Sequence, residues 1–161
     1  MGDLPLLKGN SRTQKGRYRV KNLKKYVGDP TRVYFRSGWE LKFCNWCDTS
    51  PQVVAWGSEV VKVLYRLPND KKGRVRTYYV DFAIRAKKRG GGFINLLIEL
   101  KPSNQLSPSK KAKMDRRRMM YELKNYIKIA AKQEYAIQHA KRVGMEYQIW
   151  NEKDLKRFGI I

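Results

Sequence analysis

The chain has 161 residues, of which 42% are hydrophobic, so it can form one domain with a single core and is not disordered throughout. Its 36 lysines and arginines outnumber its 14 acidic residues and give a formal net charge of +22. Such a charge favours a polyanionic partner, with nucleic acid as the first candidate and an anionic membrane surface as the second.

The first 36 residues are rich in basic side chains and poor in acidic ones, which predicts a basic N-terminal arm over residues 1–36. This arm would either be a solvated tail or grip DNA or a partner. A helix is expected to begin at Ser37, because Ser37 can cap it and Glu40 stands three residues later, where a capping box places it. Residues 37–161 would then form the folded domain.

Three strand-like runs follow, separated by turn-forming residues. The runs are 59–66, 76–85 and 93–101, and the turns are 68–73 and 90–92. Because the turns are short, the strands should form an antiparallel meander. A long helix is expected after Pro108, then a fourth strand and a short C-terminal helix. The predicted fold class is α/β, in the order helix, three antiparallel strands, helix, strand and short helix.

Neither a membrane-spanning segment nor a secretion signal is recognisable in the sequence, so we expect a protein of a reducing compartment with no membrane partner. Cys44 and Cys47 form a C-x-x-C motif, and His139 is the one histidine that could join them. Because a structural zinc site needs two more ligands, we expect both cysteines to pack in the core.

Asp81 and Glu99 stand out because each lies nine residues from Gly90, at the centre of the second turn. They should therefore face each other across the hairpin, with Cβ atoms about 5 Å apart. Two carboxylates at that distance need a shared proton or a cation between them, and Mg²⁺ prefers such oxygen ligands. Lys101 shares the face of Glu99 and could contact a phosphate oxygen or orient an attacking water. The alternative is a purely structural carboxylate pair relieved by lysines.

The motifs D-F-A-I at 81–84 and I-E-L-K at 98–101 resemble the D…(D/E)-x-K motif of the restriction-endonuclease-like, or PD-(D/E)xK, nucleases. Val80 stands where many of these nucleases have proline. Residues 21–40, 56–59 and 97–102 are similar to the head completion nucleases of T4-like tailed phages and, more distantly, to the TnsA-type transposon endonucleases.

The resemblance implies a restriction-endonuclease-like core and a DNA endonuclease that depends on Mg²⁺ or Mn²⁺. Its catalytic residues would be Glu40, Asp81, Glu99 and Lys101, and the metal ligands would be Asp81, Glu99 and the Leu100 carbonyl. It also implies action on DNA-filled phage heads before tail joining, with phage head or neck proteins as partners, in the host cytoplasm or the virion. The rivals are a DNA-binding structural protein of the head–tail junction and a transposase or resolvase on the same fold.

Other residues carry weaker expectations. Glu40 would be either a metal-site residue or only a helix cap, and Glu59 would either support the metal ligands or be an edge charge. Asn125 would contact the DNA backbone or brace the site. Phosphate contacts, as opposed to a merely solvated helix face, are expected from the basic residues Arg85, Lys87, Lys88, Arg89, Lys110, Lys111, Lys113, Arg116, Arg117, Arg118 and Lys128.

Overall fold

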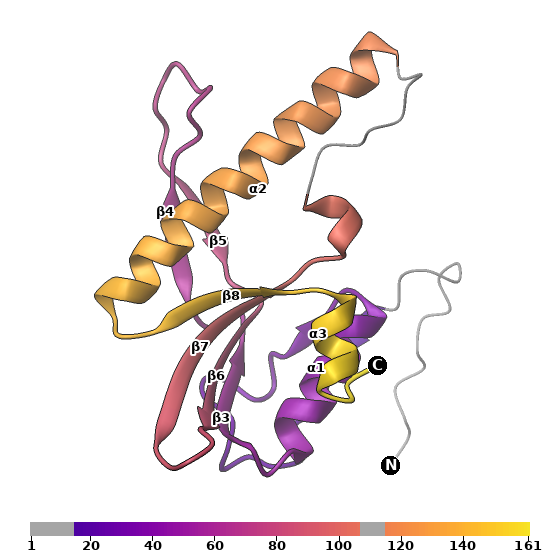
Figure 1. Cartoon of the computed structure of the whole chain (residues 1–161), viewed down its shortest axis with the longest axis vertical. Helices are drawn as coiled ribbons and strands as arrows, with labels where there is room; N and C mark the ends of the chain where they lie inside the picture. The colour runs from indigo at the N-terminus through magenta and orange to yellow at the C-terminus, as the bar shows by residue number, and fades with distance from the viewer. Residues whose placement is uncertain (1–14, 107–114) are drawn as a thin grey trace.

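The computed structural model describes residues 15–106 and 115–161, and in these ranges a four-stranded mixed sheet lies between helices (Figure 1). The strand order is β3-β6-β7-β8, with β8 parallel to β7 and the other pairs antiparallel. The strands are β3 (Val53–Ser58), β6 (Phe82–Lys87), β7 (Phe93–Leu100) and β8 (Glu146–Trp150). The predicted α/β class and the order of the core elements are confirmed.

Helix α1 (Gly38–Thr49) begins as the sequence predicted, because the Ser37 hydroxyl accepts a hydrogen bond from the Glu40 backbone N–H at 3.1 Å. It buries Phe43, Cys44 and Cys47 against one face of the sheet. Both thiols are free, and burial raises their pKa well above the usual value. They pack in the core, as expected.

The two faces of the sheet contact different helices because alternate strand residues point to opposite sides. Leu96, Ile98 and Leu100 join the core cluster of α1 and of the short helix α3 (Glu152–Arg157). Leu97 instead joins a second cluster with Ala131 of α2 (Arg116–Arg142). Both faces of β7 are therefore covered, which fixes the strand that ends at Glu99 and Leu100.

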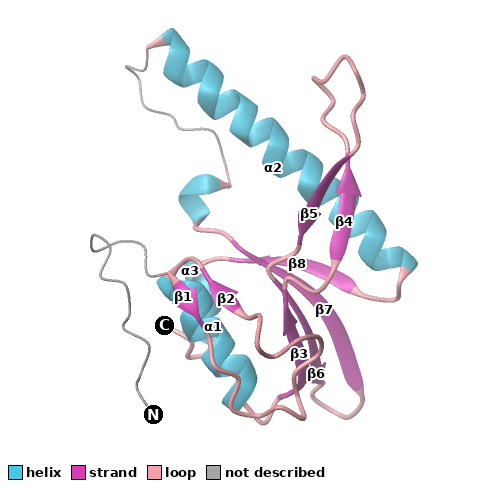
Figure 2. Cartoon of the chain, turned by 180° about the vertical axis from the view of Figure 1, so that it is seen from behind, coloured by secondary structure: helices cyan, strands magenta, loops and turns pink. Residues whose placement is uncertain are grey.

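A separate two-stranded hairpin, β4 (Lys62–Tyr65) and β5 (Arg76–Tyr79), projects beyond the sheet beside α2 (Figure 2). From the sequence we expected residues 59–66 to form the first core strand and residues 76–85 to form a single strand. Both assignments are wrong, because the first core strand is β3 and the second run breaks between Tyr79 and Phe82. Glu59 lies opposite this break, and its backbone N–H donates to the Asp81 carbonyl. Its φ of 52° lies in the left-handed region, and the register of β4 with β5 is shifted by one residue from that of β3 with β6.

The described part of the expected arm belongs to the core. Strands β1 (Gly16–Arg17) and β2 (Tyr34–Phe35) pair, and Tyr18, Val33 and Phe35 are buried in the α1 cluster. The buried Asp48 carboxylate accepts hydrogen bonds from the Tyr18 hydroxyl at 2.8 Å and from the Lys21 backbone N–H at 2.7 Å. The boundary after residue 36 is therefore wrong for residues 15–36, and residues 1–14 lie outside the described ranges.

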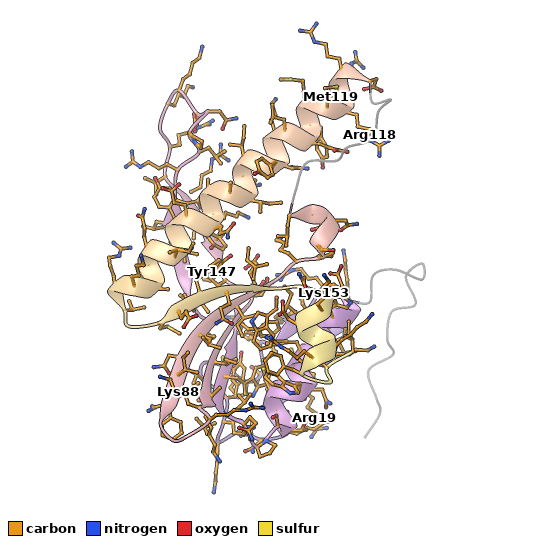
Figure 3. All side chains as sticks on the ribbon, viewed as in Figure 1. Arg19, Lys88, Arg118, Met119, Tyr147 and Lys153 are labelled. Atoms are coloured by element: carbon orange, nitrogen blue, oxygen red, sulfur yellow. The ribbon has the colours of Figure 1, made fainter. Side chains whose placement is uncertain are left out.

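Helix α2 has two unlike halves. Its C-terminal half buries Ala131, Ala136 and Ala140, and Gly144 follows with a φ of 72°, as a helix C-cap requires. Its N-terminal half projects from the sheet, with Met119 56% exposed (Figure 3). The 3-10 turn η1 (Ser103–Gln105) follows β7. No helix within the described ranges is long and apolar enough to cross a membrane.

Candidate active site

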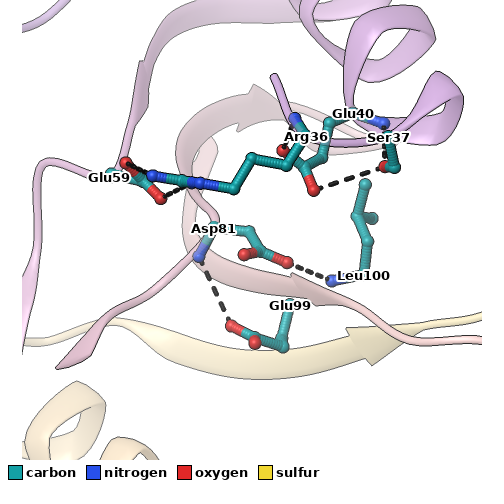
Figure 4. Close-up of polar contacts among 7 residues, drawn as sticks. All are labelled: Arg36, Ser37, Glu40, Glu59, Asp81, Glu99 and Leu100. Carbon is teal, nitrogen blue, oxygen red and sulfur yellow. Dashed lines mark hydrogen bonds and ion pairs between the residues drawn. The ribbon is translucent and has the colours of Figure 1, made fainter. Parts of the chain in front are cut away.

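Asp81 and Glu99 lie side by side at the end of the sheet where the β4–β5 hairpin begins (Figure 4). Phe82 pairs with Ile98 and Lys87 with Phe93, and this register extended by one residue sets Asp81 opposite Glu99. The Asp81 carboxylate accepts from the Leu100 backbone N–H at 2.9 Å, and the Glu99 carboxylate accepts from the Asp81 backbone N–H at 3.4 Å. The juxtaposition predicted from the spacing about Gly90 is present.

The environment of the pair disfavours two negative charges. Burial and then the charge of Glu99 raise the pKa of Asp81 well above its usual range, while the Leu100 N–H opposes the shift. Burial also raises the pKa of Glu99, opposed by the Lys101 ammonium, whose nitrogen lies 3.7 Å from a Glu99 carboxylate oxygen. Without a further cation, the pair retains a proton to higher pH than an ordinary carboxyl group does.

Glu40 serves the helix cap and reaches the site at the same time. One carboxylate oxygen accepts from the Arg36 backbone N–H at 2.8 Å and the other from the Ser37 hydroxyl at 3.3 Å. Its charge also raises the pKa of Asp81, so the carboxylate lies within electrostatic reach of the pair. The cap thereby holds a third carboxylate near Asp81 and Glu99.

Glu59 supports the backbone of Asp81. Its backbone N–H donates to the Asp81 carbonyl at 3.0 Å, and its carboxylate forms an ion pair with the Arg36 guanidinium. Glu59 sits between β3 and β4 and does not open a strand. Arg36 was not singled out from the sequence, where a basic residue just before a helix cap gives no sign of a partner 23 residues away.

Lys132 is a second residue that the sequence did not single out. It is half-buried on α2, and its ammonium lies 5.1 Å from the centroid of the Tyr78 ring and 5.7 Å from that of Tyr65. Burial lowers its pKa, whereas the charge of Glu99 raises it. The sequence signal that could have identified Lys132 is its position among the buried alanines of α2, where a lysine is unexpected. Asn125, about two helical turns earlier, is exposed, and its role stays a prediction.

The predicted DNA contacts do not gather around the carboxylates. Arg85, Lys87, Lys88 and Arg89 lie toward the β6–β7 turn, which is nine residues, or about 30 Å, from Asp81. Figure 3 shows Lys88 at that far end. Arg116–Arg118 open the projecting half of α2, and Lys128 is exposed further along it. Lys110, Lys111 and Lys113 lie outside the described residues.

The donor set fits a hard divalent cation. In the described part of the chain, no three His, Cys, Asp or Glu side chains converge tightly enough to hold a metal alone. Two adjacent carboxylates do suit Mg²⁺, which keeps several waters and takes further oxygens from substrate phosphates. A cation there would also relieve the repulsion that raises the pKa of Asp81.

Comparisons with known proteins point to nucleases. Residues 50–152 match the family described as TnsA-like endonuclease N terminal, and this range includes Asp81, Glu99 and Lys101 but not Glu40. The chain is also 31% identical over 148 residues to the head completion nuclease of Enterobacteria phage T4. That alignment covers 89% of this chain and 95% of the relative.

Proposed function

The chain belongs to the TnsA-like endonuclease N-terminal family, and from this premise we propose that it is a metal-dependent DNA endonuclease that acts in completing phage heads. The observation that carries the proposal is the partly buried Asp81–Glu99 pair with Lys101 beside it. A core would not gain from two adjacent carboxylates, because each raises the cost of ionising the other.

Asp81 and Glu99 would hold the metal through their carboxylate oxygens, with the Leu100 carbonyl as a third donor. Mg²⁺ or Mn²⁺ bound there supplies positive charge that stabilises the negative charge developing on the attacked phosphate. Glu40, held by the α1 cap, would orient water or support the ligands from the side of the sheet opposite α2.

Lys101 would act on the substrate side. Its side chain is 28% exposed, and its ammonium can move from Glu99 toward a phosphate oxygen or the attacking water. The positive charge would then stabilise the phosphate as negative charge builds up on its oxygens. In the absence of DNA, the same charge partly offsets the charge of Glu99.

The biological setting is carried by the T4 relative, whose name states head completion and nuclease. We infer that this chain acts on DNA at filled heads, with phage head or neck proteins as partners, in the host cytoplasm during assembly or in the virion. The net charge of +22 supports a DNA substrate.

A cleavage assay tests the proposal. Supercoiled plasmid and linear duplex should be cut by the full chain in Mg²⁺ or Mn²⁺ and left intact in EDTA. Glu99→Gln keeps the shape and removes one charged donor, so it should bind DNA but cut at least a hundredfold more slowly. If the wild-type chain binds DNA yet never cuts it with either metal, the structural-protein alternative is correct.

A further inference from the structure

We propose that the β4–β5 hairpin is a DNA-binding arm whose exposed basic side chains bind the phosphate backbone of the duplex beside the active site. The proposal rests on the proposed function, because it takes duplex DNA as the substrate. It assigns DNA contact to residues that we had expected, from the sequence, to belong to the core sheet.

The hairpin is joined to the site without an intervening loop. Beyond the Glu59–Asp81 backbone bond, the Val80 N–H donates to the Val61 carbonyl at 3.1 Å, so the pairing continues through the junction. Proline, common at this position in the restriction-endonuclease-like motif, has no N–H to donate. Valine here thus keeps the hairpin hydrogen-bonded up to the residue next to Asp81.

The two faces of the hairpin differ sharply. Val63, Tyr65 and Tyr78 are buried against α2, and the Tyr78 hydroxyl donates to the Lys132 carbonyl at 3.0 Å. This packing anchors the hairpin. The opposite face, which we call the outer face, is exposed and consists of Lys62, Leu64, Thr77 and Tyr79.

The outer face begins close to the carboxylates. Lys62 pairs with Tyr79, and Tyr79 is only two residues, or about 7 Å along the strand, from Asp81. A side chain on this face can therefore contact phosphates next to the one being cut. On the β6–β7 side, the first basic residue is Arg85, four residues from Asp81, and its guanidinium stacks on Phe93 at 4.7 Å.

The charge of the hairpin matches a polyanion. Residues 62–79 contain one acidic residue, Asp70, and six basic ones, namely Lys62, Arg66, Lys71, Lys72, Arg74 and Arg76. Asp70 lies beneath two of them, with its side chain 8% exposed and 3.1 Å from the Arg74 guanidinium. Arg66 also donates to the Gly73 carbonyl at 3.1 Å, so the tip is braced while Lys71 and Lys72 remain exposed.

The arrangement suits duplex DNA because exposed basic side chains stand at both ends of the hairpin, with Lys62 near the site and Lys71, Lys72 and Arg74 near the tip. Such contacts bind phosphates regardless of sequence, and each one neutralised adds about −0.9 to the slope of log K against log salt. The projecting half of α2, which carries Arg116–Arg118, extends toward the same end of the molecule as the hairpin (Figures 1 and 2).

Binding in EDTA tests the arm apart from cleavage. Lys71→Gln/Lys72→Gln should weaken duplex binding roughly tenfold at moderate salt and reduce the magnitude of the salt slope by about 2. Lys87→Gln/Lys88→Gln removes the same charge from exposed positions at the β6–β7 turn and should lose less than half as much affinity on a logarithmic scale. Lys62→Gln alone should weaken binding severalfold.

The proposal would be wrong if the two double variants lost equal DNA affinity, or if Lys71→Gln/Lys72→Gln bound DNA as tightly as wild type. Each variant is first checked by its thermal melting curve, and Lys62→Gln provides a second reading from a residue outside the tip. The proposed function would be contradicted by a different result. If the wild-type chain binds DNA through the hairpin but does not cut it with Mg²⁺ or Mn²⁺, the DNA-binding arm is supported and the nuclease proposal is wrong.

Discussion

Two hairpins meet at Asp81, and they differ in burial and in charge. The β6–β7 hairpin lies inside the four-stranded sheet, where Phe82 and Ile98 are buried and paired across the strands. The β4–β5 hairpin covers α2 with one face and exposes the other. Because β7 is buried on both faces, the β6–β7 hairpin can hold two carboxylates at a fixed separation. The exposed basic side chains of the β4–β5 hairpin are instead free to adjust to a bound ligand. We therefore assign the chemistry to the first hairpin and DNA binding to the second.

The most direct test of this difference is Lys101→Ala, which removes the only basic residue in the described ranges that lies within 4 Å of the carboxylate pair. We expect cleavage to fall by roughly a hundredfold to a thousandfold, because positive charge at the attacked phosphate is lost. DNA binding in EDTA should weaken only slightly. Single-turnover cleavage beside a binding titration measures both, and a large binding defect with normal cleavage would contradict the assignment.

The stability of the two hairpins can be compared with one substitution in each. Phe82 is 1% exposed, and its ring centroid lies 4.4 Å from that of Phe43. Phe82→Ala should therefore lower the free energy of unfolding by about 3–5 kcal/mol. Leu64→Ala, at a position that is 54% exposed, should change stability by no more than about 0.5 kcal/mol. Urea unfolding of both variants gives the two values, and similar losses would mean that the outer face of the hairpin is covered.

The pH dependence of stability should show a smaller effect than the loss of stability expected for Phe82→Ala. Because the pKa of Asp81 is higher in the folded state than in the unfolded chain, the metal-free protein loses stability as pH rises above the unfolded value of about 4. Asp81→Asn removes this loss and retains an oxygen that can accept from Leu100 N–H.

The metal-free Asp81→Asn variant should therefore be about 1–3 kcal/mol more stable than wild type at pH 7 and nearly equal to it near pH 4. Denaturant unfolding in EDTA at the two pH values measures the difference. A stabilisation that is the same at both pH values would show that ionisation of Asp81 is not the cause.

The same two hairpins show what the sequence could predict. The register of Asp81 and Glu99 followed from their equal distance to Gly90, because the pairing runs unshifted from the turn to the site. The split into β4–β5 could not be foreseen, since it depends on the left-handed backbone of Glu59, a residue type that gives no such signal.

Contacts made through space were also beyond the sequence. Arg36 meets Glu59 only because the segment before α1 passes the junction of β3 and β4, and Lys132 approaches Glu99 only because α2 crosses that face of the sheet. The α1 cap at Ser37 was predicted because capping depends on neighbours in the chain, and α3 begins with a cap of the same kind at Asn151.

The central claim is that the two partly buried carboxylates perform the chemistry while the basic surface binds the DNA. Single-turnover cleavage of duplex DNA by Asp81→Asn in Mg²⁺, with binding measured in EDTA, tests it most directly. We predict a cleavage rate at least a hundredfold below wild type, with binding unchanged or tighter because the neutral amide adds no negative charge that could repel the phosphate. Cleavage at the wild-type rate would show that the Asp81–Glu99 pair is not the active site.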